Sequence, residues 1–280
     1  MRKQFLGMAA SILFAASPLI AAQNITVKGS DTMVILNQRW AEKYMGAHKD
    51  AVVQVTGGGS GTGISALLSG STDICASSRP MSEKEKADLT AKGGTAIEIP
   101  VAKDGVAIYV NSKNSVKELT MAQIKDIYTG KITNWKDVGG ADGRIILYSR
   151  ENNSGTYVFF KEHMLNKQDF SPMAQSLPGT SAVVNAVSRD PKSIGYGGAA
   201  YAKGIKFVAV KADDQSPAFL PDESHILSGK YAASRNLFFY LRAPATGDLK
   251  KFIDWVLSPE GQGVVSSVGY FPLKKAAAKK

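Results

Sequence analysis

The stretch VVQVTGGGSGTGISALL at residues 52–68 joins a β-like apolar run, a glycine-rich turn and the start of a helix-like pattern. A strand that turns directly into a helix leaves the first N–H groups of the helix unpaired, and these groups point into the turn. Together with the positive end of the helix dipole, they form a site that suits an anion. The stretch therefore predicts one strand-turn-helix unit of an α/β sheet with an anion site in its turn.

Two further stretches share this pattern. Apolar residues 25–27 lead into GSDTM at 29–33, and residues 145–147 lead into SRENNSGT at 149–156. Because Ser and Thr are also ordinary helix N-caps, a single turn of this kind is weak evidence for a ligand. Three together favour a shared anion site. Its candidate hydroxyl donors are Thr32, Ser60, Ser154 and Thr156, and its candidate charges are Arg79 and Arg150, whose guanidinium forks suit oxyanion oxygens.

Strands alternate with helices along most of the remaining chain, which predicts an α/β fold with ligands at the carboxyl ends of parallel strands. Two sequences of the capping-box type, Ser82 with Glu85 and Thr120 with Gln123, predict the starts of two of the helices. Further strands are expected at 73–76, 193–196 and 206–210, and further helices at 181–189 and 249–257.

Two β runs are suited to crossings between lobes. They are residues 95–110, which we expect to be interrupted at Lys103-Asp104-Gly105, and residues 236–241. We therefore expect a two-lobed α/β protein. Lobe one contains residues 23–105 plus 240–280, lobe two contains residues 106–239, and the anion lies in the cleft between them.

The ends of the chain and its composition limit the classes of function. Residues 1–22 have a basic start, an apolar run and a small-residue exit, which predicts a secretory signal peptide cleaved after Ala22 and an exported, soluble mature protein. The 280 residues include one cysteine, Cys75, so an intramolecular disulfide is excluded. The three histidines lack ligand spacing, and we expect no metal and no cofactor. The net charge of +10 is compatible with an anionic ligand, but no basic run is interleaved with aromatics as in nucleic-acid-binding proteins.

Other chemistry finds less support. The glycine run at 57–63 lacks the Gly-Lys-Ser/Thr ending of a P-loop, and GYGGAA at 195–200 lacks the acidic residue that follows a dinucleotide-binding turn. We expect the second glycine run to be a turn that permits close packing. No G-x-S-x-G elbow surrounds Ser60, and no histidine is placed as a base for a serine nucleophile, so we expect no enzyme.

Several blocks carry a resemblance to a known family. Beside the three turns, these are ASSRPM at 76–81, IYTGKITNW at 127–135, IGYGG at 194–198, RNLFFY at 235–240 and LSPEGQ at 257–262. With them, essentially the whole mature chain resembles the PstS-like periplasmic phosphate-binding proteins of bacterial ABC phosphate-uptake systems. The resemblance implies a Venus-flytrap fold with two hinge crossings that closes on inorganic phosphate and delivers it to a membrane permease. It also implies that Thr32, Ser60, Arg150, Ser154, Gly155 and Thr156 contact the anion. We expect a monomer.

One position departs from the family pattern. Family members carry an aspartate directly after the Ala-Ser of the third-strand turn, where it accepts the proton of hydrogen phosphate and rejects sulfate, whereas this chain has Ser78. We expect Asp31, between Ser30 and Thr32, to supply the missing acceptor; the alternative is that Asp31 only caps the following helix. Glu151 and Ser78 itself are further candidates.

Two other functions stay open at this stage. One is a receptor for another tetrahedral oxyanion, such as sulfate or molybdate. The other is a secreted phosphoester hydrolase that uses Ser60 or Ser154.

Overall fold

The computed structural model describes residues 24–201 and 204–273, so the predicted signal peptide and the C-terminal lysines lie outside the described residues. Ten strands form one sheet, in which β2-β1-β3-β10-β4-β8-β6-β7 lie side by side, while β9 pairs with β4 and β5. The strands are β1 (Asn24–Gly29), β2 (Val52–Thr56), β3 (Ile74–Ser77), β4 (Ile97–Val110), β5 (Glu118–Thr120), β6 (Ile146–Arg150), β7 (Gln175–Leu177), β8 (Ser193–Gly198), β9 (Lys206–Lys211) and β10 (Ser234–Leu241).

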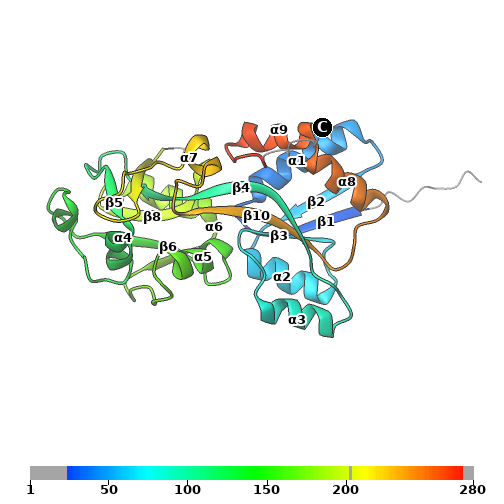
Figure 1. The fold of residues 1–280 in the computed structure, drawn as a ribbon, viewed down its shortest axis with the longest axis horizontal. Coiled ribbons are helices and arrows are strands. Elements are labelled where there is room, and N and C mark those ends of the chain that lie inside the picture. The colour runs from blue at the N-terminus through cyan, green and yellow to red at the C-terminus, as the bar shows by residue number, and fades with distance from the viewer. Residues whose placement is uncertain (1–23, 202–203, 274–280) are drawn as a thin grey trace, which may run out of the picture.

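Helices pack around this sheet in two groups (Figure 1). They are α1 (Val34–Ala47), α2 (Ser60–Ser69), α3 (Glu83–Ala91), α4 (Met121–Tyr128), α5 (Gly155–His163), α6 (Gly179–Arg189), α7 (Glu223–Leu227), α8 (Gly247–Leu257) and α9 (Pro259–Val268), with 3₁₀ turns η1 (Trp135–Val138) and η2 (Ala199–Tyr201). Within the described part of the chain, none of these helices is both long enough and apolar enough to span a membrane.

The predicted strand-turn-helix units are confirmed. β1 pairs in parallel with both β2 and β3, and β6 pairs in parallel with β8 and β7. Both capping boxes form: the Ser82 hydroxyl accepts a hydrogen bond from the Glu85 N–H, and the Thr120 hydroxyl accepts one from the Gln123 N–H. Because parallel strands end at the same edge of a sheet, their carboxyl-terminal turns are brought together.

β4 and β10 join the two groups of elements (Figure 1). They run antiparallel to each other, from Ser234 opposite Gly105 to Leu241 opposite Ile97, and the second half of β4 then pairs with β8. The expected interruption at residues 103–105 is wrong, since β4 is one continuous strand. The charged Asp104 is tolerated inside the strand because Arg235, its register partner on β10, forms an ion pair with it.

Two main groups of buried side chains lie on either side of this junction. One contains Tyr128, Phe160 and Tyr196. The other is centred on Trp40 and contains Phe239 and Phe252 together with Val183, Val184 and Val187 of α6. Since this second cluster takes in a helix assigned to lobe two, the exact boundaries of the lobes stay a prediction.

The glycine run at 195–200 forms most of strand β8 and not a turn. A Cβ atom on Gly195 would lie 2.6 Å from Val183 Cγ1, and one on Gly197 would lie 2.7 Å from Thr180 Cγ2. The prediction that these glycines permit close packing is therefore confirmed, with α6 as the neighbouring element.

Candidate anion-binding site

The three predicted turns meet at one point of the structure. Thr32, in the turn after β1, and Thr156, in the first turn of α5, have their hydroxyl oxygens 2.8 Å apart. Ser60 opens α2, and its hydroxyl oxygen lies 3.4 Å from that of Ser78, whose backbone N–H donates to it at 3.1 Å. All four side chains are buried. Four hydroxyls from separate parts of the chain thus form one buried polar cluster.

Helix α5 points its N-terminus at this cluster. A Cβ atom on Gly155 would lie 2.3 Å from Ser60 Oγ and 2.7 Å from Ser78 Oγ, so only glycine fits there. The Ser154 hydroxyl caps the helix by accepting a hydrogen bond from the Tyr157 N–H at 3.3 Å. The first N–H groups of α5 and the positive end of its dipole therefore lie beside the hydroxyls of the other turns.

Arg150, at the end of β6, is the buried cation of the site, with 1% of its side chain exposed. Its guanidinium donates from Nη1 to the Thr180 hydroxyl at 2.9 Å and from Nη2 to Asp31 Oδ2 at 2.9 Å. Burial lowers the pKa of Arg150, and the Asp31 charge counters this effect. The Nε–H of Arg150 is buried, and only two of the five N–H bonds of the guanidinium have an acceptor among the described residues. Donors are therefore left for a ligand.

Asp31 connects two of the turns. Its Oδ1 accepts a hydrogen bond from the Gly58 N–H at 2.7 Å, and its Oδ2 accepts one from Nη2 of Arg150. The alternative that Asp31 caps the following helix is wrong: the N-cap of α1 is Met33, and no side chain caps it. Ser30 beside it is buried, and its N–H donates to the Ala76 carbonyl at 2.8 Å.

Arg79 is not brought into the cluster as a free charge. Its fork donates to both carboxylate oxygens of Glu85, at 2.7 and 2.8 Å. The reason is local: the capping box formed with Ser82 fixes the Glu85 carboxylate beside Arg79. The geometry therefore does not support the expectation that Arg79 directs its charge at the anion.

Arg235 is absent from the sequence-based set of site residues but contacts the hydroxyl cluster, and Asp104, also absent from that set, holds it in place. Arg235 donates to the Thr156 hydroxyl at 2.9 Å and to Asp104 Oδ2 at 2.8 and 3.0 Å. Complete burial raises the pKa of the Asp104 carboxyl, and the charge and hydrogen bonds of Arg235 counter this. The available signal was a pair of opposite charges, with Asp104 inside one of the β runs predicted to cross between lobes and Arg235 directly before the other.

The contacts of Asn153 explain why the turn at residues 57–63 is rich in glycine. Its carbonyl accepts a hydrogen bond from the Gly61 N–H at 2.9 Å, and its side-chain amide donates to the Gly58 carbonyl at 3.0 Å and to the Thr62 hydroxyl at 3.2 Å. A Cβ atom on Gly59 would lie 2.8 Å from the Asn153 carbonyl oxygen. The run therefore permits close approach of the turn after β6, which sequence reasoning had not foreseen.

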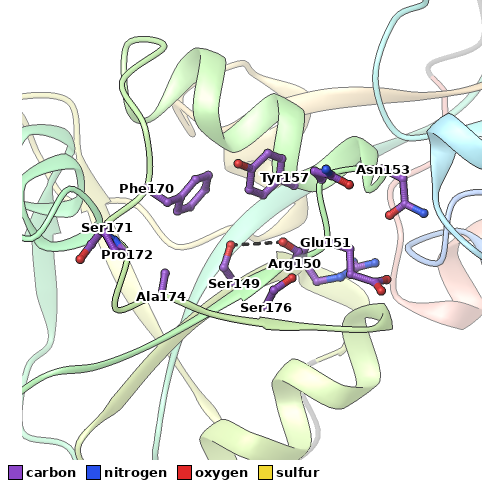
Figure 2. Close-up of a pocket in the computed structure, with 11 residues that line it drawn as sticks. Ser149, Arg150, Glu151, Asn153, Tyr157, Phe170, Ser171, Pro172, Ala174 and Ser176 are labelled. Carbon is purple, nitrogen blue, oxygen red and sulfur yellow. Dashed lines mark hydrogen bonds between the residues drawn. The ribbon is translucent and has the colours of Figure 1, made fainter.

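A pocket of about 490 Å³ opens beside the turn that carries Arg150. Figure 2 shows Glu151 and Asn153 on one side of it, and Tyr157 and Phe170 on another. The two aromatic rings stack, with centroids 4.7 Å apart. Glu151, the second candidate acceptor, lies on the wall of this pocket and not within the hydroxyl cluster.

Among residues 24–201 and 204–273, no group of three or more His, Cys, Asp or Glu side chains is arranged to hold a metal ion. Cys75 is a buried free thiol whose pKa is raised by burial. The histidines contact other parts of the molecule: His48, which directly follows α1, contacts the Tyr44 carbonyl, His163 contacts the Phe159 carbonyl of α5, and His225 pairs with Asp222.

Comparison with known proteins identifies the family. Residues 16–260 match the model of the PBP superfamily domain. The phosphate-binding protein PstS of Staphylococcus epidermidis is 37% identical over 262 residues, which cover 90% of this chain and 79% of the relative. This chain belongs to the PstS-like phosphate-binding proteins.

Solved structures of family members have the same fold. A Clostridium perfringens protein solved with bound phosphate is similar, with a TM-score of 0.82 and 30% identity, covering 90% of this chain and all of that one. An ABC-type phosphate transport receptor from Vibrio cholerae matches with a TM-score of 0.72 and 29% identity, covering 89% of this chain and 100% of its own. The fold is therefore the two-lobed α/β fold of periplasmic binding proteins, as predicted.

Proposed function

We propose that this protein is an extracytoplasmic receptor that captures inorganic phosphate between its two lobes and delivers it to the membrane permease of an ABC transporter. The observation that carries the proposal is the buried cluster of hydroxyls at the N-terminus of α5, together with the buried Arg150, whose Nε–H has no acceptor among the described residues. Relatives with this fold are named phosphate-binding and phosphate-transport proteins, and one was solved with phosphate bound.

The chemistry of the cluster suits a dehydrated oxyanion. Such a ligand must exchange its water shell for hydrogen-bond donors that are already in place, and donors in a buried site interact more strongly than donors in water. We assign this role to the hydroxyls of Thr32, Ser60, Ser154 and Thr156, to the N–H groups that open α5 at Gly155, and to Arg150. Ser30, Asp31 and Ser78 line the same site.

The positions of these groups in the chain support closure of the two lobes. Thr32 lies in the turn after β1 and Ser60 opens α2, whereas Arg150 ends β6 and Thr156 lies in the first turn of α5. In this structure the two sets touch, which supports the proposal that the lobes close on each other. Only a ligand that binds the closed state more tightly than the open state drives closure. Phosphate contacted from both sides meets this requirement.

Binding without catalysis is the function that the site supports best. None of the three histidines contacts Ser60 or Ser154, so neither serine has an imidazole base in this structure. We infer a monomer that acts outside the cytoplasmic membrane after removal of its signal peptide.

Calorimetry on phosphate-free, dialysed protein tests the proposal. We expect phosphate to bind and sulfate and molybdate to bind far more weakly, because a carboxylate at Asp31 would accept a hydrogen bond from a protonated anion and repel an unprotonated one. Small-angle scattering on the same samples should show a smaller radius of gyration with phosphate. Absence of phosphate binding, or tighter binding of sulfate, contradicts the proposed function. Release of product from a chromogenic phosphoester would point to a hydrolase.

A further inference from the structure

An ion pair lies at the centre of the two strands that cross between the lobes. Arg235 of β10 and Asp104 of β4 are direct partners in the strand register, and 3% and 0% of their side chains are exposed. Two N–H groups of Arg235 donate to Asp104 Oδ2, while Asp104 Oδ1 accepts the Ala199 N–H at 3.2 Å. The guanidinium is thereby fixed in one orientation.

The same guanidinium reaches both sides of the anion site. Its Nη1 donates to the Ser78 carbonyl at 3.0 Å, and its Nη2 donates to the Thr156 hydroxyl at 2.9 Å. Its central carbon lies 5.3 Å from the centre of the Phe159 ring on α5, within the range of a cation–π contact. One side chain therefore contacts both crossing strands, the turn after β3 and the first turns of α5.

The direction of the hydrogen bond to Thr156 is fixed by chemistry. A guanidinium has donors and no acceptor, so the Thr156 oxygen must accept from Arg235. The hydroxyl proton of Thr156 is then directed away from Arg235, and the nearest partner is the Thr32 hydroxyl at 2.8 Å inside the cluster. A hydroxyl that accepts from a cation is a stronger donor, because hydrogen bonds in a chain polarise one another.

We propose that Arg235, held by Asp104, is a positioning residue that aims the Thr156 hydroxyl at the anion and ties it to the crossing strands. Four of the five N–H bonds of the guanidinium are accounted for by protein acceptors. Arg235 therefore acts through Thr156 and does not contact the anion directly, as Arg150 is proposed to do. This inference rests on the proposed function, and its test separates the two.

Replacement of Arg235 alone would leave a buried, unpaired carboxylate and destabilise the fold. The charge-balanced variant Asp104→Asn/Arg235→Met avoids this, and Arg235→Lys, which keeps a cation beside Asp104 but loses the fork, is an independent second variant. Each is made in the wild-type and Thr156→Val backgrounds, which gives double-mutant cycles. Circular dichroism and thermal unfolding identify the variants that fold. Arg242→Gln is the matched control, because Arg242 lies beyond β10 and donates to the Lys92 carbonyl.

Phosphate affinity by calorimetry is the readout. We expect each Arg235 variant to bind about tenfold more weakly than the wild type, and to lose about twofold or less in the Thr156→Val background. Arg242→Gln should match the wild type. Equal losses in both backgrounds, or a folded Arg235 variant with wild-type affinity, overturn the positioning role. A wild-type protein that does not bind phosphate would instead overturn the proposed function.

Discussion

The contact of Asn153 with the glycine-rich turn predicts that a residue outside the anion cluster controls phosphate affinity. In Asn153→Ala, the hydrogen bonds from the side-chain amide to the Gly58 carbonyl and the Thr62 hydroxyl are lost, while the backbone bond from Gly61 remains. Asn153 is exposed, so each bond contributes at the lower end of the usual range, about 0.5–1 kcal/mol. The sum of about 1–2 kcal/mol corresponds to about 5- to 30-fold in affinity.

The effect should be mainly on dissociation. Both bonds join the turn after β2 to the turn after β6, so in the proposed mechanism they form only as the lobes close. Their loss leaves the open state unchanged and shortens the lifetime of the closed complex. Calorimetry gives the dissociation constant, and stopped-flow mixing with a phosphate trap gives the dissociation rate.

Two further variants make this test specific. Asn152→Ala alters the exposed neighbour, for which no side-chain hydrogen bond is seen to the described residues, and should bind as the wild type does. Gly61→Ala perturbs the same contact from the other side, because its Cβ atom would lie 3.2 Å from the Asn153 carbonyl oxygen. Equal dissociation rates for Asn153→Ala and Asn152→Ala would refute the reasoning.

Three other substitutions test the site. Arg150→Ala should weaken phosphate binding by about ten- to a hundredfold, and unchanged calorimetric affinity would remove Arg150 from the site. Asp31→Asn should narrow the preference for phosphate over sulfate, since a fixed carboxylate accepts from a protonated anion and repels sulfate; an equal loss for both anions would mean that Asp31 only holds Arg150. Arg79→Gln should leave phosphate affinity within about threefold and lower stability at pH 7 by about 1 kcal/mol, and a loss as large as that of Arg150→Ala would return Arg79 to the ligand set. Burial raises the pKa of Glu85, but the hydrogen bonds from Arg79 and Ser82 and the Arg79 charge outweigh this and lower it. The stabilisation is thus present above the ordinary carboxyl pKa of about 4.3 and lost as the pH falls through the lowered pKa, so thermal unfolding curves of wild type and Arg79→Gln should converge in acid.

Local signals account for the parts of the fold that the sequence predicted correctly. The apolar runs before each turn, and the capping boxes at Ser82 and Thr120, specify structure through residues within a few positions of one another. The break expected at residues 103–105 failed because Lys-Asp-Gly has loop composition, while the partner that keeps Asp104 inside the strand lies 131 positions away. A strand stabilised by such a distant partner has no local signature.

In the candidate site, too, residues with a local sequence signal were predicted, and residues whose contacts depend on distant parts of the chain were not. The hydroxyls at Thr32, Ser60 and Thr156 were found because each follows a strand in a recognisable turn, and the structure brings them together. For Arg79, composition alone does not show that the neighbouring Glu85 carboxylate takes two of its N–H donors. Arg235 was missed as a site residue because its contact with Thr156 depends on the pairing of β10 with β4, which only the folded sheet reveals.

The position of β10 in the sheet governs when the protein can become folded. β10 lies between β3 and β4 in the sheet. The sheet therefore lacks the strand that joins β3 to β4 until residues 234–241 have been synthesised. Helices α8 and α9, which follow β10, pack against α1, so the cluster that contains Trp40 is complete only after these helices have been synthesised. A chain made from its N-terminus therefore stays without a finished first lobe until more than nine-tenths of it exists. If the chain crosses a membrane before it folds, as the proposed export implies, this order of synthesis means that the first lobe cannot be completed while most of the chain is still being made.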